Sequence, residues 1–149
     1  MSTVVIALGN PLRGDDGIGN VLLDRLRERG LPADVEFRDL GDGGFDVLHA
    51  LADADRAVIV DAVRFGGEPG ECAVFEPDDV AAVVESRGSH DSDLFELLDL
   101  AAAREEAPER VVIFGVQPGG MRAGERLSDP VETALPDLTD ALVEVVEGL

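Results

Sequence analysis

The stretch Val4–Gly19, VVIALGNPLRGDDGIG, constrains the fold of this chain more than any other part of the sequence. Five consecutive apolar residues, Val4–Leu8, are typical of a strand that is covered on both faces of a sheet. A glycine- and proline-containing turn ends this strand, and Asp15 and Asp16 follow where an amphipathic helix begins. The turn between a parallel strand and the next helix is a common position for functional groups.

Strands and helices alternate along the rest of the chain. Buried strands are predicted at 57–63 (AVIVDAV) and 111–116 (VVIFGV), and a strand nearer a sheet edge at 35–40. Apolar residues at helical spacing predict helices at 18–29, 45–54, 77–84, 93–104 and 130–147, with Asp129 as the cap of the last one. The alternation predicts an α/β fold, a three-layer αβα sandwich with a mixed, mainly parallel sheet of about five strands, as a single domain over residues 1–149.

The order of the first strands decides which side chains meet. If the order is 2-1-3, the first and third predicted strands are neighbours, and Asp16 and Asp61 emerge at the same carboxyl edge. The short turn before Cys72 predicts that 72–75 (CAVF) forms an antiparallel hairpin with strand 57–63. Cys72 is the single cysteine, which excludes an internal disulfide, and its apolar neighbours predict a buried, unreactive thiol.

The charge of the chain is strongly one-sided. There are 32 acidic and 12 basic residues, all of the latter arginine, and the formal net charge is −20. Such a surface repels nucleic acids and anionic membranes, so neither is expected as a partner. An acidic surface of this kind is typical of proteins adapted to high salt. The beginning of the chain has no signal-peptide pattern, and we expect a cytoplasmic monomer.

Candidate metal ligands are Asp15 or Asp16, Asp61 and His90, the last in a polar loop. Two carboxylates and one imidazole suit a divalent transition ion such as Ni²⁺ or Zn²⁺, and three protein ligands leave coordination positions open. Other roles are open for each residue. One aspartate of the pair could cap the following helix, Asp61 could form a salt bridge with an arginine, and His90 could be an ordinary surface histidine.

Several short motifs follow one another in a characteristic order over nearly the whole chain. They are Gly9-Asn10-Pro11 with Gly14–Gly19, Asp42-Gly43-Gly44, Val60-Asp61-Ala62, Ser89-His90-Asp91 and Gly115–Pro118. In this set the sequence resembles the hydrogenase maturation endopeptidase family, nickel-dependent proteases that process the large subunit of nickel–iron hydrogenases. The resemblance implies a twisted, mixed five-stranded sheet between helices, in agreement with the pattern of strands and helices.

The resemblance also implies roles for individual residues. It implies that Asp16, rather than Asp15, binds the metal together with Asp61 and His90. The metal is nickel supplied by the substrate, with zinc or cadmium as a surrogate. The residues expected to contact the substrate are Asp42, Gly43, Gly44 and Gln117.

The function implied is removal of a C-terminal extension from the nickel-loaded large-subunit precursor, with the nickel as the recognition mark. Two mechanisms are open: the metal could polarise the scissile carbonyl, or a carboxylate, Asp16 or Asp42, could act as general base in an aspartic-type endopeptidase. A non-catalytic nickel-binding chaperone or checkpoint module for hydrogenase assembly is the alternative. A nucleotide-binding domain is disfavoured, because GNPLRG lacks the lysine and hydroxyl residue of a phosphate loop.

Overall fold

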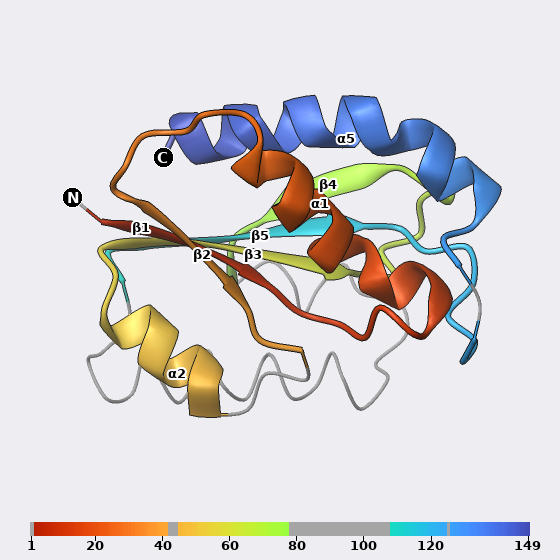
Figure 1. Ribbon diagram of the computed structural model, residues 1–149, viewed down its shortest axis with the longest axis horizontal. Helices are drawn as coiled ribbons and strands as arrows, with labels where there is room; N and C mark the ends of the chain where they lie inside the picture. Colours follow the sequence, from red (N-terminus) through yellow and green to blue (C-terminus); the bar gives the residue numbers. More distant parts are fainter. Residues whose placement is uncertain (1, 42–44, 78–107, 125) are drawn as a thin grey trace.

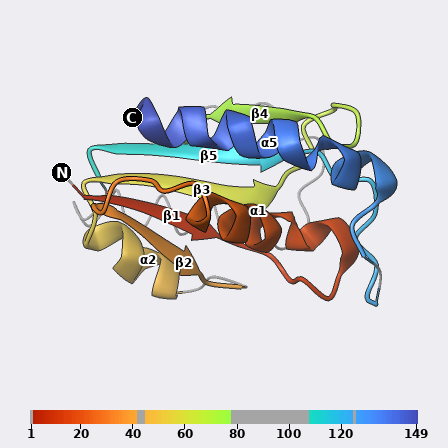
Figure 2. The same ribbon diagram turned by 45° about the horizontal axis from the view of Figure 1, so that its top comes forward.

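The computed structural model describes residues 2–41, 45–77, 108–124 and 126–149, and these form a five-stranded sheet with helices on both faces (Figure 1). The strands are β1 (Thr3–Ala7), β2 (Val35–Asp39), β3 (Arg56–Ala62), β4 (Cys72–Phe75) and β5 (Arg110–Val116). Their order in the sheet is β2-β1-β3-β5-β4, and β4 is the antiparallel member (Figure 2). The predicted mixed, mainly parallel sheet is confirmed, including the placement of β1 between β2 and β3.

The helices cover the sheet in two layers. A short 3-10 helix, η1 (Gly14–Gly17), leads directly into α1 (Ile18–Arg27), and the other described helices are α2 (Phe45–Ala52) and α5 (Asp129–Glu147). Helices α1 and α5 lie on one face of the sheet and α2 lies on the other (Figures 1 and 2). The predicted helix 93–104 and all of the predicted helix 77–84 except Pro77 lie outside the described residues. None of the described helices is long and apolar enough to cross a membrane.

The central strands are buried on both faces, as their continuous apolar sequences predict. In β3, Val58 and Val60 pack with the residues of α1 and α5, whereas Ala57 and Ile59 pack with those of α2. This follows from the alternation of side chains along a strand. A fully buried valine or isoleucine side chain contributes about 1.5–3 kcal/mol to the stability of the fold, so the apolar side chains on both faces of the sheet hold it firmly between the helices.

Helix α5 presents its apolar side to the sheet, as predicted. Leu135, Leu138 and Leu142 are buried on this side, and Pro136 is accommodated on the exposed side within the helix. The expectation that Asp129 caps the helix is wrong. Ser128 occupies the cap position, and its hydroxyl group is bonded elsewhere, to Asp15.

The predicted hairpin between β3 and β4 is wrong, because β5 lies between these two strands. Strand β4 pairs with β5 in antiparallel register, Cys72 opposite Val116. The connection after β3 passes the end of β5, where the Gln117 N–H donates to the carbonyl of Glu71 over 2.8 Å. A connection of this length can pass the end of a third strand, so its length alone did not require a hairpin.

Cys72 is exposed on this edge strand, and the expectation of a buried thiol is also wrong. An edge strand has one uncovered side, so an apolar sequence there does not ensure burial. Partial burial of the sulfur raises the pKa of the Cys72 thiol, because it disfavours the charged form. The negative charge of Glu71 raises this pKa further. Both effects favour the protonated and less nucleophilic form.

Candidate functional site

The ends of β1 and β3 lie side by side at the carboxyl edge of the sheet. Ala7 is opposite Val60 in the parallel register, and beyond β1 the Leu8 N–H donates to the Val60 carbonyl over 3.0 Å. The turn that follows Leu8 and the carboxylate of Asp61 are therefore at the same edge, as the predicted strand order requires. Helix η1, which carries Asp16, contacts β3 directly.

The turn around Asp16 is tightly folded. The carboxylate of Asp16 is partly buried, and its Oδ2 accepts a hydrogen bond from the Asn10 N–H over 3.0 Å. Gly9 has φ +114°, and a Cβ atom at this position would overlap the Asp16 carbonyl oxygen. Only glycine allows this approach, so the turn brings Asp16 back onto the end of β1.

A second close approach fixes α1 against the same strand ends. A Cβ atom on Gly19 would lie 2.8 Å from the Val60 carbonyl oxygen and 2.9 Å from that of Leu8. These distances are shorter than real Cβ contacts, and the neighbouring atoms belong to the backbone and cannot move easily. The first turn of α1 therefore packs directly on β1 and β3, which fixes the turn containing Asp16 relative to the end of β3.

Asp61 lies near the end of β3 and is fully buried. Its Oδ1 accepts a hydrogen bond from the Ala62 N–H over 2.8 Å. By the alternation along the strand, Asp61 is on the same side of the sheet as Ile59 and Val63, the side covered by α2. A carboxylate buried at this depth needs hydrogen-bonding or ionic partners, which makes its surroundings polar within an otherwise apolar layer.

The other predicted site residues divide into two groups. Gln117 is 9% exposed, and its Oε1 accepts hydrogen bonds from the Phe65 N–H over 2.9 Å and the Gly67 N–H over 3.2 Å. Its side-chain carbonyl thus holds the connection between β3 and β4, and a contact with substrate stays a prediction. The second group of predicted site residues lies outside the described residues and consists of His90, Asp42, Gly43 and Gly44.

Asp15 has a role that the sequence did not reveal. It is fully buried and accepts hydrogen bonds at Oδ2 from the N–H groups of Gly119 (2.7 Å) and Gly120 (3.1 Å). The backbone and hydroxyl groups of Ser128 donate two more, over 2.7 and 2.6 Å. The Asp15 N–H returns a bond to the Gly120 carbonyl over 2.8 Å. Asp15 therefore ties η1 to the loop that follows β5.

The surroundings of Asp15 favour its ionised form. Burial by itself raises the pKa of this carboxyl group, but the hydrogen bonds from Ser128, Gly119 and Gly120 together outweigh burial and lower the pKa below its ordinary value of 3.8. Neither Asp15 nor Asp16 caps α1 through its side chain. The signal in the sequence was the Gly119-Gly120 pair. Glycine has no side chain, so the backbone N–H groups of two consecutive glycines can approach one carboxylate.

The donor set of the candidate metal site fits a divalent transition ion. Asp16 and Asp61 supply carboxylate oxygens at one edge of the sheet. Within residues 2–41, 45–77, 108–124 and 126–149, no three His, Cys, Asp or Glu side chains gather closely enough to hold a metal ion. A complete site therefore needs a ligand from elsewhere in the chain or from a substrate, and His90 is the predicted third ligand.

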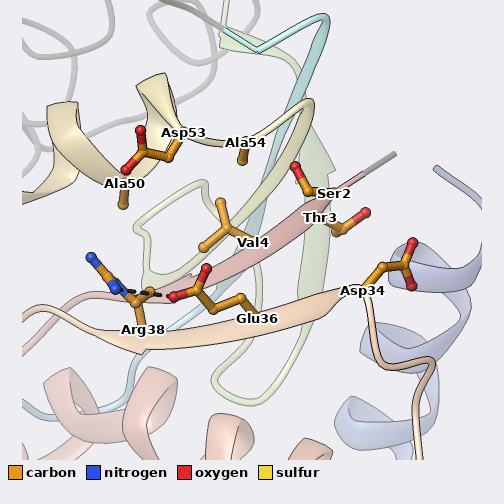
Figure 3. Close-up of a pocket in the computed structure, with 9 residues that line it drawn as sticks. All are labelled: Ser2, Thr3, Val4, Asp34, Glu36, Arg38, Ala50, Asp53 and Ala54. Carbon is orange, nitrogen blue, oxygen red and sulfur yellow. Dashed lines mark hydrogen bonds and ion pairs between the residues drawn. The ribbon is translucent and has the colours of Figure 1, made fainter.

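A hollow of about 90 Å³ lies beside β2, on the side of the sheet that α2 covers (Figure 3). Ser2, Thr3 and Val4 of the β1 segment line it together with residues of β2 and the end of α2. Figure 3 shows Arg38 of β2 paired with Glu36, at 3.0 Å, on one side of the hollow. Neither Asp16 nor Asp61 lines this hollow.

These features define an α/β protein with Asp16 after β1 and Asp61 near the end of β3, at the carboxyl edge of two neighbouring parallel strands. The family model described as HycI, hydrogenase maturation protease, matches residues 21–145. The chain therefore belongs to the hydrogenase maturation protease family, which consists of peptidases.

Curated relatives agree with this assignment. The chain is 30% identical over 149 residues to the hydrogenase expression/formation protein HupM of Azotobacter chroococcum, a match that covers 97% of this chain and 71% of HupM. It is 31% identical over 118 residues to HupD of Rhodobacter capsulatus, which covers 77% of this chain but spans only 56% of that relative.

Solved structures show the same fold. The hydrogenase maturating endopeptidase HybD from Escherichia coli superimposes with a TM-score of 0.88 at 25% identity, over 99% of this chain and 93% of HybD. The [NiFe] hydrogenase maturation protease HycI from Thermococcus kodakarensis gives 0.78 at 27% identity, over 98% and 92% of the two chains.

Proposed function

We propose that this protein is an endopeptidase that removes the C-terminal extension of a nickel-loaded [NiFe]-hydrogenase large-subunit precursor. Membership of the hydrogenase maturation protease family supports a peptidase role in hydrogenase maturation. The nickel that the precursor carries is part of the substrate, and its contact with Asp16, Asp61 and His90 marks the precursor as ready for cleavage.

One observation carries the proposal most directly. Asp16 follows β1 and Asp61 lies near the end of the neighbouring parallel strand β3, and the close packing of Gly19 on the carbonyls of Leu8 and Val60 fixes the two segments against each other. Preorganised carboxylates at the edge of a sheet can bind a cation without rearranging, so more of the interaction energy remains for recognition. Oxygen ligands with open coordination positions also suit a metal that arrives with other ligands already attached.

In this proposal the groups at the site divide the work. Asp16, Asp61 and His90 bind the nickel of the precursor and so place the scissile peptide at the edge of the sheet. Asp42, Gly43, Gly44 and Gln117 contact the extended substrate backbone. A carboxylate, Asp16 or Asp42, takes the proton of the attacking water. Zinc or cadmium occupies the same ligands as a surrogate.

The test is incubation of the protein with nickel-loaded precursor, followed by intact-mass measurement. The wild-type protein is expected to release the extension. We expect D16N, D61N and H90A each to lower kcat/KM roughly 100-fold or more, because loss of a group that positions the scissile peptide can cost about that much. D55N is the matched control, because Asp55 is exposed at the amino end of the sheet.

The contrary outcomes are distinct. Cleavage by all three variants at the wild-type rate would exclude a role of these three residues in cleavage. Wild-type binding of nickel-loaded precursor without loss of mass would instead indicate the checkpoint function.

A further inference from the structure

Two loops at the carboxyl edge carry arginines in an otherwise acidic protein. We call them the clamped loop pair: residues 10–13 (NPLR) after β1, and the described residues of 118–128 after β5. Arg13, Arg122 and Arg126 are exposed there, and the described residues of the pair include no acidic residue. Glu125 lies outside the described residues. In a chain with 32 acidic and 12 basic residues, this local excess of arginine is unusual.

Among the described residues, these arginines differ from the others in their acidic partners. Elsewhere, Arg27, Arg29, Arg38 and Arg110 form ion pairs with Asp24, Asp140, Glu36 and Glu76. Arg13, Arg122 and Arg126 form no ion pair in the part of the chain that the structure describes. Three guanidinium groups are thus available for a partner, and guanidinium is well suited to binding carboxylates in two-pronged geometry.

Backbone contacts join the two loops into one surface. The Gly124 N–H donates to the Leu12 carbonyl over 2.7 Å. Gly14 has φ +58°, and a Cβ atom there would lie 2.6 Å from the Gly120 carbonyl oxygen and 3.5 Å from that of Arg126. Asp15 adds the four hydrogen bonds described above. The surface is therefore held in one arrangement before a partner arrives, which lowers the entropic cost of binding.

Leu12 stands at the tip of the first loop and is 72% exposed. A single exposed leucine is ordinary on a protein surface. Here it is next to Arg13, and its backbone is bonded to the loop that carries Arg122 and Arg126. Arginine is among the residues that most often dominate the binding energy of protein–protein interfaces, and an exposed apolar side chain beside arginines adds surface that a partner can cover.

We propose that the clamped loop pair docks an acidic segment of the hydrogenase precursor. Arg13, Arg122 and Arg126 pair with carboxylates of that segment, and Leu12 contacts an apolar side chain within it. This inference rests on the proposed function, since it names the part of the substrate that the protein contacts. The rest of the surface has a net negative charge and repels an acidic segment. The acidic segment of the precursor is therefore directed to the clamped loop pair.

The experiment compares charge reversals inside and outside the loop pair. R122E is matched with R25E, because Arg25 is exposed on α1 and forms no ion pair among the described residues. A triple variant, R13E/R122E/R126E, gives the full effect. Processing of nickel-loaded precursor is measured at low and high ionic strength, with circular dichroism to verify folding.

We expect the triple variant to lower kcat/KM at low ionic strength roughly tenfold or more with little change in kcat, since charges at an interface act mainly on association. The R122E variant should show a smaller loss and R25E less than a twofold change. High salt should shrink the losses, because it screens exposed charges.

Several outcomes would overturn the proposal. Equal losses in R122E and R25E would exclude a local docking role, and a rise in kcat/KM of the triple variant would indicate a basic partner segment. A fall in kcat alone would indicate damage to the site. If the triple variant is misfolded, R13Q/R122Q/R126Q is measured against R25Q with the same expectations.

The two proposals can fail separately. If the wild-type protein does not cleave the precursor, the proposed function fails. Calorimetric titration of the precursor into wild-type protein, R122E and R25E then still tests docking. Weaker binding of R122E alone supports it, and equal binding of the three excludes it.

Discussion

The two ends of the sheet are built in different ways. At the amino end the polar contacts are exposed, as where Asp55 accepts hydrogen bonds from Ser2. At the carboxyl end, Asp15 is fully buried among four donors. A buried hydrogen-bonded carboxylate is costly to disturb, whereas an exposed one is readily replaced by water.

This difference shows where the chain maintains a fixed geometry. The carboxyl edge holds a candidate site, and its loops are fastened to each other through a carboxylate at the centre. The amino end is a solvated connection region in which each polar contact can be lost at little cost. Three predictions test this contrast, in order of decreasing expected effect.

Replacement of Asp15 should have the largest effect. D15A leaves the amides of Gly119, Gly120 and Ser128 without their acceptor, and we expect a loss of roughly 2–4 kcal/mol in the free energy of unfolding. D55A at the amino end should cost less than about 1 kcal/mol, because its partners are exposed. Urea unfolding followed by circular dichroism measures both, and similar losses would contradict the contrast.

The second prediction concerns the free energy of unfolding at low pH. The pKa of Asp15 is lower in the folded protein than its ordinary value. The contribution of the Asp15 carboxylate to the free energy of unfolding is therefore complete above the pKa that this group has in the unfolded chain, about 3.9, and is lost as the pH falls further. The difference in unfolding free energy between wild type and D15N should be constant between pH 7 and about 5 and shrink below about 4. A difference that does not change with pH would show that the charge of Asp15 is not what the loop amides bind.

Replacement of Arg38 should have the smallest effect. The Arg38–Glu36 pair is exposed, and such pairs contribute about 0.2–1 kcal/mol. R38A is expected to lower the unfolding free energy within that range, and the difference should disappear in high salt. Thermal and urea unfolding at two salt concentrations measure this. A loss as large as that of D15A would mean that an exposed contact stabilises the protein as strongly as the buried hydrogen bonds of Asp15.

Much of the fold follows from the periodicity of the sequence. Continuous apolar runs such as Val4–Leu8 predicted the strands covered on both faces, and right-handed connections placed β1 beside β3. The position of β4 could not be predicted in this way. It depends on Gln117, whose backbone and side chain hold the connection after β3, and this contact is distant in the sequence.

The candidate site was predictable to a smaller extent. The sequence placed Asp16 and Asp61 at one edge, because Asp16 comes after the first predicted strand and Asp61 is near the end of the predicted parallel strand 57–63. It could not separate Asp15 from Asp16, since adjacent aspartates have the same intrinsic preferences. The difference arises from donors more than 100 residues later in the chain, Gly119, Gly120 and Ser128.

That separation has a consequence for the order in which the protein matures during its own synthesis. The turn containing Asp15 leaves the ribosome well before Ser128, which supplies two of its four donors and is 113 positions behind it. Contacts between such distant residues form slowly and late. The nascent chain therefore carries an uncompleted edge until these residues emerge, and a polypeptide interrupted before residue 128 lacks two of the four hydrogen bonds that fasten this edge.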